Sequence, residues 1–185
     1  MKSEEELREL VARIVDEAVT EDPPRTVATE TTRVALGADH GGYELKQKLA
    51  AHLRDRGYEM TDCGTDSAAS VDYPDVAYAV AKLVASGRCH CGVIIDGAGI
   101  GSTMVANKVA GVRAALCYDL SSARNSREHN HANVLALGAG LIGDNLAHQI
   151  LDTWLETPWG SGRHARRVAM IDEIEKRGFA AGEQS

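Results

Sequence analysis

From residue 33 onward, segments typical of buried β-strands alternate with segments typical of amphipathic helices. The strand-like segments are short apolar runs at 33–37, 58–64, 91–96, 112–117 and 133–138. Helical patterns cover 41–57, 72–86, 101–108, 119–130, 143–156 and 163–176. Such alternation is typical of a parallel sheet with helices on both faces. The sequence therefore predicts one three-layer α/β/α domain over residues 33–185, built on five parallel strands.

The first 32 residues differ in composition from this domain. Apolar residues between 7 and 18 recur at three- and four-residue spacing, and Ser3 with Glu6 matches a capping box, so residues 1–19 predict an amphipathic helix. Residues 20–32 contain two prolines and a run of threonines, which is typical of a linker. The segment carries nine acidic and only four basic side chains, so it is compositionally separate.

Composition narrows the class of protein. A net charge of −7 argues against a nucleic-acid surface, and no apolar run is long enough to span a membrane. The first residues are too acidic for a secretory signal, so we expect a cytoplasmic protein. The four cysteines suit small buried hydrophobes in a reducing compartment. Cys89 and Cys91, around His90, lack a second ligand pair at zinc-site spacing, so no metal is expected.

An acidic residue, Asp96, ends the third strand-like run and precedes a glycine-rich loop at residues 97–101. Ligands of open parallel sheets bind beyond the carboxyl ends of the strands, which places Asp96 on one rim with Asp39 and His40. Glycines allow close backbone approach, and amides at a helix start stabilise negative charge. The spacing is not that of the dinucleotide fingerprint. Taken alone, the loop is equally compatible with a tight turn that binds nothing.

Two further features are compatible with a phosphorylated ligand. Arg163 and Arg167 lie four residues apart on one helical face, a spacing that suits a phosphate clamp or a solvated basic face. His129 stands shortly before the fifth strand-like run.

Together these segments resemble the ribose-5-phosphate isomerase type B family, which also includes galactose-6-phosphate and allose-6-phosphate isomerases. The matching pieces are "ALGADHGGYELK", "DCGTDSAASVDYPDVA", "GAGIGSTMVANKVAGVRAALCYDLSSAR", "REHNHANVLALG" and "GRHARRV". The resemblance implies a Rossmann-like sheet and metal-independent, cofactor-free interconversion of aldose and ketose phosphates through an enediolate. It also implies homodimers, or dimers of dimers, with active sites at subunit interfaces.

The resemblance also assigns residues. Asp96 and His129 become catalytic candidates, His129 for ring opening or, alternatively, as a structural histidine at a helix end. The candidates for binding the sugar and its phosphate are Asp39, His40, Asp72, Tyr73, Gly97, Ala98, Gly99, Ile100, Gly101, Asn107, Arg163 and Arg167.

The chain departs from the family pattern at four positions. Asp96 replaces the cysteine that removes the carbon-2 proton in many members, and Ser102 replaces the glutamate base of another branch. Ala98 replaces a loop threonine, and Gly140 replaces an arginine that often contributes to the anion site. The working hypothesis is that Asp96 is the base. The alternatives are that Asp96 caps the helix after the loop, or that the protein binds a sugar phosphate without converting it.

Ribose 5-phosphate is the first substrate expectation, with other four- to six-carbon aldose phosphates as alternatives. A nucleotide-binding oxidoreductase is disfavoured because the loop spacing is wrong. The N-terminal helix resembles encapsulation peptides, which implies that residues 3–19 dock on shell or cargo proteins of a bacterial microcompartment. Alternatively, that helix packs on its own domain or on the dimer partner. A membrane-surface role is disfavoured because its polar face is rich in glutamate.

Overall fold

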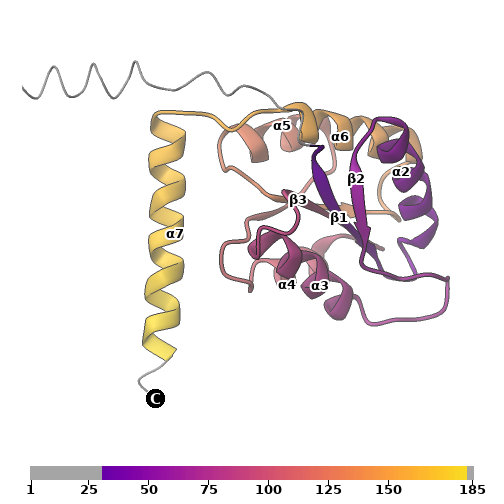
Figure 1. The fold of residues 1–185 in the computed structure, drawn as a ribbon, viewed down its shortest axis with the longest axis horizontal. Helices are drawn as coiled ribbons and strands as arrows, with labels where there is room; N and C mark the ends of the chain where they lie inside the picture. The colour runs from indigo at the N-terminus through magenta and orange to yellow at the C-terminus, as the bar shows by residue number, and fades with distance from the viewer. Residues whose placement is uncertain (1–30, 183–185) are drawn as a thin grey trace, which may run out of the picture. The chain divides into compact units, whose positions relative to one another are not determined.

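The computed structural model describes residues 31–182, with side chains described as far as residue 178. One sheet of five parallel strands has the order β2-β1-β3-β5-β4 (Figure 1). The strands are β1 (Arg33–Ala38), β2 (Glu59–Asp62), β3 (Cys91–Asp96), β4 (Ala114–Leu116) and β5 (Val134–Gly138). The predicted five-stranded parallel sheet is therefore confirmed.

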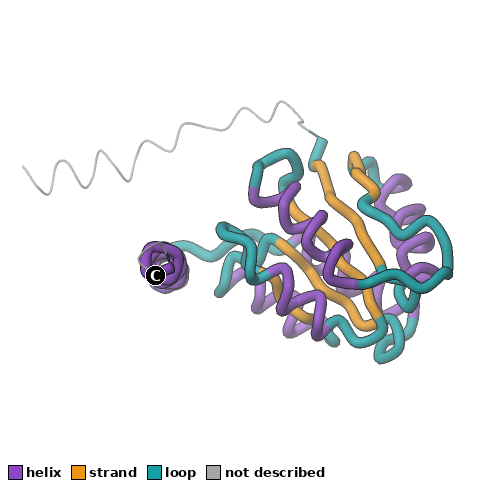
Figure 2. The backbone as a smooth tube through the Cα atoms, turned by 90° about the horizontal axis from the view of Figure 1, so that it is seen from below, coloured by secondary structure: helices purple, strands orange, loops and turns teal. Residues whose placement is uncertain are grey.

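Helices cover both faces of this sheet, as Figure 2 shows. One layer contains α2 (Tyr43–Asp55), α5 (Leu120–Glu128) and α6 (Asp144–Glu156), and the other contains α3 (Tyr73–Ala85) and α4 (Ile100–Ala106). Two apolar clusters, one on each face, form the core. Every residue of β3 is buried, because a central parallel strand is covered on both sides.

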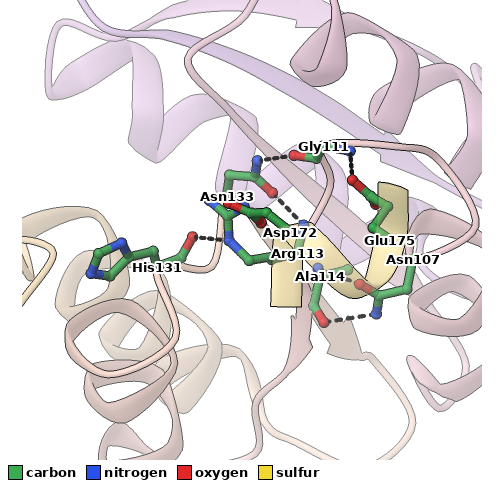
Figure 3. Close-up of polar contacts among 8 residues, drawn as sticks. All are labelled: Asn107, Gly111, Arg113, Ala114, His131, Asn133, Asp172 and Glu175. Carbon is green, nitrogen blue, oxygen red and sulfur yellow. Dashed lines mark hydrogen bonds and ion pairs between the residues drawn. The ribbon is translucent and has the colours of Figure 1, made fainter. Parts of the chain in front are cut away.

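The last helix, α7 (Arg163–Gly182), extends six residues beyond the predicted end and belongs to neither layer (Figures 1 and 2). Two carboxylates of α7 tie it to the turn before β4 (Figure 3). Asp172 Oδ1 lies 3.0 Å from Arg113 Nη1, and Glu175 accepts a hydrogen bond of 2.9 Å from the amide of Gly111. α7 is therefore fixed at the edge of the sheet where β4 and β5 begin.

Much of the apolar surface of α7 is solvent-exposed. Met170 is 52% exposed, Ile171 45% and Ile174 67%. Residues 170, 171 and 174 fall on one side of a helix because they are separated by one, three and four positions. This side is an apolar stripe that stays about half exposed, although Ile171 and Ile174 line a hollow with Val112 and Arg113.

The predicted helix at 1–19 and residues 20–30 of the predicted linker lie outside the described residues. Among the described helices, none combines the length and the apolar composition that crossing a bilayer requires.

Candidate active site

Strand register brings the predicted acidic residues to one rim of the sheet. Ala38 at the end of β1 is level with Ile95, and Asp96 at the end of β3 is level with Gly138. The amide of Asp39 also donates to Ile95 O at 3.1 Å. Asp39, Asp96 and the start of the glycine loop are thus neighbours at the carboxyl ends of β1 and β3, where parallel sheets bind ligands.

The turn after β1 holds Asp39 against this rim. Asp39 is 9% exposed, and its Oδ1 accepts a hydrogen bond of 3.0 Å from the amide of Gly42. Gly42 has to be glycine, because a Cβ there would overlap the main-chain carbonyl of Ile95. His40 is exposed, and its Nδ1 accepts a hydrogen bond of 3.4 Å from the amide of Val71. This bond joins the turn to the segment that leads into α3.

Asp72 and Tyr73 stand at the start of α3. Asp72 is the N-cap residue, although its side chain makes no capping hydrogen bond. The ring of Tyr73 lies over Gly101: a Cβ on Gly101 would come within 2.8 Å of the Tyr73 ring and hydroxyl. The glycine therefore leaves space for the tyrosine beside the loop.

Asp96 is 6% exposed, and its carboxylate faces its own loop. Oδ1 accepts hydrogen bonds from the amides of Ala98, at 2.8 Å, and of Gly99. Oδ2 accepts from the hydroxyl of Ser102 at 2.5 Å and from the amide of Ser102 at 3.3 Å. Asp96 therefore makes hydrogen bonds to the loop and to the start of α4, as expected if it caps this helix, which was the alternative to its being the base.

Two features hold the loop in this shape. Gly99 has a φ of 77°, a left-handed conformation that favours glycine, and it lets the chain turn back over Asp96. The hydroxyl of Tyr118 donates to Ala98 O at 2.8 Å. The amides of Gly97, Ile100 and Gly101 find no acceptor within the described part of the chain. These three amides are therefore unpaired within the described residues.

The remaining predicted residues form a second group. His129, Arg163 and Arg167 line a hollow of about 300 Å³ beside α5 and α7. The ring of His129 stacks on that of His164, with 4.1 Å between ring centroids. Desolvation lowers the pKa of His164, and the neighbouring His129 and Arg163 lower it further. The hollow thus combines two arginines with two imidazoles, a set of donors that suits a phosphate.

The two groups lie at opposite ends of the strands. Asp96 follows β3 at its carboxyl end, whereas His129 precedes β5 at its amino end, and the two strands are parallel and adjacent. A strand of this length spans about 13 Å. No hydrogen bond, ion pair or ring contact in residues 31–178 joins His129 or the arginines to Asp96. Within one chain, the structure does not bring these two groups together.

Asn107 also lies away from the glycine loop. Its side-chain amide exchanges two hydrogen bonds with the backbone of Ala114, at 2.9 and 3.0 Å, and so ties the end of α4 to β4 (Figure 3). Three residues beside the candidates were not assigned from the sequence: Ser102, Tyr118 and His164. All three lie inside the motifs quoted above, and Ser102 also stands at the position of a family base, but the sequence assigned none of them a role.

Comparison with known proteins gives a consistent match. The family model described as Ribose/Galactose Isomerase matches residues 34–171. Ribose-5-phosphate isomerase B of Escherichia coli is 46% identical over 145 residues, which cover 78% of this chain and 97% of that protein. D-erythrulose-4-phosphate isomerase of Pectobacterium atrosepticum is 40% identical over 143 residues, 77% of this chain and 94% of that protein.

Solved structures agree with this match. A structure of Clostridium thermocellum ribose-5-phosphate isomerase B superposes with a TM-score of 0.78 at 51% identity, covering 79% of this chain and 99% of that one. The fold, the order of the motifs and these matches lead to the same assignment. The chain belongs to the ribose/galactose isomerase family.

Proposed function

We propose that this protein interconverts an aldose phosphate and a ketose phosphate through an enediolate, with ribose 5-phosphate and ribulose 5-phosphate as the first candidate pair. The observation that carries the proposal is the rim of the sheet, where Asp96, Asp39 and free loop amides meet in a member of an isomerase family. The named activities of the Escherichia coli and Clostridium thermocellum relatives support this substrate.

The reaction needs a base at carbon 2 and donors for the developing oxyanion. Asp96 removes the carbon-2 proton, and the electron pair of that C–H bond forms the carbon 1–carbon 2 double bond of the enediolate. The proton of the carbon-2 hydroxyl moves to the carbon-1 oxygen, and Asp96 returns its proton to carbon 1. General acid–base catalysis of this kind contributes about 10²–10⁴-fold. The amides of Gly97, Ile100 and Gly101 stabilise the anionic oxygen, which contributes a comparable factor.

The substrate-binding groups have distinct tasks in this proposal. Asp39 and His40 contact sugar hydroxyls, with Asp72 and Tyr73 on the facing side. His129 opens the sugar ring, and Arg163 with Arg167 holds the phosphate. Because these last three residues lie at the end of the strands away from Asp96, a second copy of the chain has to supply them.

A homodimer, or a dimer of such dimers, is therefore part of the proposal. It accounts for two observations: one chain separates Asp96 from His129, and α7 exposes the apolar stripe of Met170, Ile171 and Ile174. Apolar area left exposed on a helix is typical of an interaction surface. The stripe adjoins Arg163 and Arg167 on the same helix, so contact through α7 brings these arginines toward a partner.

Gly140 makes other aldose phosphates reasonable alternatives. It is exposed on the rim, and its amide donates to Gly97 O at 2.9 Å, so no side chain contributes to the anion site there. The named activity of the Pectobacterium atrosepticum relative concerns a four-carbon sugar phosphate. A panel of four-, five- and six-carbon aldose phosphates identifies the substrate by its kcat/KM.

The test of the function is exchange of the carbon-2 proton with deuterated water, followed by NMR. Wild-type protein should exchange the proton and form ketose, whereas Asp96→Asn should lose about 10²-fold or more. An Asp96→Asn variant within a few-fold of wild type excludes Asp96 as the base.

A sugar-phosphate binder without activity is the second candidate. It is favoured by one observation: all the hydrogen bonds of the Asp96 carboxylate serve its own loop and α4. Such a protein would bind aldose phosphates in calorimetry but show no exchange of the carbon-2 proton with any of them.

We further propose that residues 3–19 recruit the protein to a bacterial microcompartment, and that the protein otherwise resides in the cytoplasm. The sequence supports this with one apolar stripe on a charged, acidic segment followed by a proline-containing linker. Deletion of residues 1–30 should abolish co-localisation with shell proteins and leave isomerase activity intact. Loss of activity or of the dimer would instead indicate that the segment packs on the protein itself.

A further inference from the structure

Ser102 and Asp96 form a buried pair that the proposed reaction has so far not used. Ser102 is 1% exposed and Asp96 is 6% exposed. Ser102 Oγ lies 2.5 Å from Asp96 Oδ2, at the short end of the range for hydroxyl–carboxylate hydrogen bonds. Five residues separate them in the sequence, and the pair exists because the glycine loop returns α4 to the end of β3.

The carboxylate of Asp96 has no acceptor position left. A carboxylate offers about four lone-pair sites, and Asp96 receives four donors. Three donors are backbone amides, those of Ala98, Gly99 and Ser102, and the fourth is the Ser102 hydroxyl. For Asp96 to accept a proton from carbon 2 of a sugar, one of these donors has to withdraw.

The hydroxyl is the donor that can withdraw at least cost. The three amides are fixed by the loop, whose shape depends on Gly99 and on the Tyr118 hydrogen bond. A serine hydroxyl turns about one side-chain bond between staggered positions.

We propose that Ser102 is a positioning residue for Asp96, whose hydroxyl holds the carboxylate in place and withdraws to free Oδ2 for the carbon-2 proton. This inference rests on the proposed isomerase function. When the substrate C–H bond breaks, its proton bonds to Oδ2 and its electron pair stays in the enediolate. The Ser102 hydroxyl keeps its own proton throughout and bonds again to Oδ2 when Asp96 has delivered the proton to carbon 1.

Few other titratable groups face this pair. From the neighbouring elements these are Asp39 after β1, Tyr73 at the start of α3 and Tyr118 after β4. Within the described residues, none of the three hydrogen-bonds to the Asp96 carboxylate. Substitution of Ser102 therefore changes the surroundings of Asp96 without removing another charged partner.

The test is the pH dependence of kcat/KM for carbon-2 proton exchange in wild type and Ser102→Ala. Because Ser102→Ala removes one hydrogen bond to the charged carboxylate, the acidic limb of the profile should move upward by about one to two pH units. Ser102→Thr, which keeps a hydroxyl, should return the limb toward the wild-type position. Ser102→Cys, a weak donor of similar size, should give a smaller shift in the same direction and serves if the alanine variant does not fold.

Ser126→Ala is the matched control, because Ser126 is also buried and its hydroxyl donates to a helical carbonyl, Ala123 O, at 2.9 Å. This control should leave the acidic limb in place. If wild type is active and the acidic limb of the pH profile is unchanged in both Ser102→Ala and Ser102→Cys, the inference is overturned. The isomerase function then stands. Absence of exchange in wild type with every aldose phosphate overturns the function, and the inference with it.

Discussion

Subunit complementation is the most direct test of a site shared between two chains. Asp96 and Arg167 belong to groups at opposite ends of the strands. In the proposed dimer each site therefore takes Asp96 from one subunit and Arg167 from the other. Asp96→Asn should lower kcat/KM by about 10²-fold or more. Arg167→Ala should lower it by about 10- to 100-fold, the value of a hydrogen bond to a charged group.

Mixing the two variants should restore activity. In a one-to-one random mixture, half of the dimers contain one subunit of each kind. One of the two sites in such a dimer carries both substitutions, and the other carries neither. The unseparated mixture should therefore reach about one quarter of wild-type kcat/KM, and the purified mixed dimers about one half, both well above the mean of the two parents.

The assay uses co-expression with two different affinity tags, so that mixed dimers are purified and counted by native mass spectrometry. The matched control mixes Asp96→Asn with Asp39→Asn, which lie on the same rim. In that mixed dimer both sites stay defective, so no activity should return. If verified mixed dimers of Asp96→Asn and Arg167→Ala show only the mean activity of their parents, the shared site is refuted.

Three further predictions concern the fold around the rim. Lys46 is 1% exposed, and its Nζ lies 2.7 Å from Asp62 Oδ1. Asp62→Ala leaves this ammonium buried without a counter-charge, so it should lower the free energy of unfolding in urea by about 3 kcal/mol. Lys46→Met removes the charge itself and should cost less, about 1–2 kcal/mol, and the reverse order contradicts the reasoning. Gly42→Ala should cost about 2–3 kcal/mol in the same assay, because its Cβ meets the backbone of Ile95, and a neutral result excludes the close approach. Burial raises the pKa of Cys63 to about 11. The rate at which a thiol reagent labels Cys63 should therefore rise about tenfold per pH unit from pH 8 to 10. A labelling rate that does not change over this range contradicts the raised pKa.

The sign of the Cys63 effect on stability follows from the same pKa. In the unfolded chain the thiol ionises near 9.0, whereas in the folded protein it ionises at about 11. Between these values the unfolded state binds fewer protons than the folded state, so stability decreases as pH rises above about 9. The effect is absent below pH 8, where both forms are neutral.

The fold was largely predictable because it depends on local patterns that repeat along the chain. The run from Cys91 to Asp96 is apolar throughout, as a strand buried on both faces has to be, and the helices begin within two residues of the expected positions. The rim was also predictable, since parallel strands end on the same side and this rule places Asp39 and Asp96 on one rim, and the pairing of β1 with β3 then makes them neighbours. The six extra residues of α7 were not, because Gly178, which a sequence pattern would take as a helix stop, does not end the helix.

The separation of the candidate residues needed the structure. The motifs name Asp96 and His129 as parts of one site, but a list of motifs does not say at which end of a strand each residue stands in space. His129 precedes β5, and Asp96 is the last residue of β3. Because β3 and β5 are adjacent and parallel, the two residues lie at opposite ends of these strands. The sequence therefore names candidates for one site, whereas the sheet topology places them in two groups at opposite ends of β3 and β5.

The pairing of Asp96 with Ser102 lay beyond sequence reasoning for a different physical reason. The sequence shows only that each position lacks the base found there in a branch of the family, which indicates two separate losses. Their contact depends on the left-handed turn at Gly99, which brings the first turn of α4 back over the end of β3. A cysteine at 96 would receive weaker hydrogen bonds than a carboxylate, because sulfur is a weak acceptor. The two substitutions are therefore coupled: an aspartate held by this loop requires a donor that can both stabilise its charge and withdraw, and a serine at position 102 is small enough, and mobile enough, to do both.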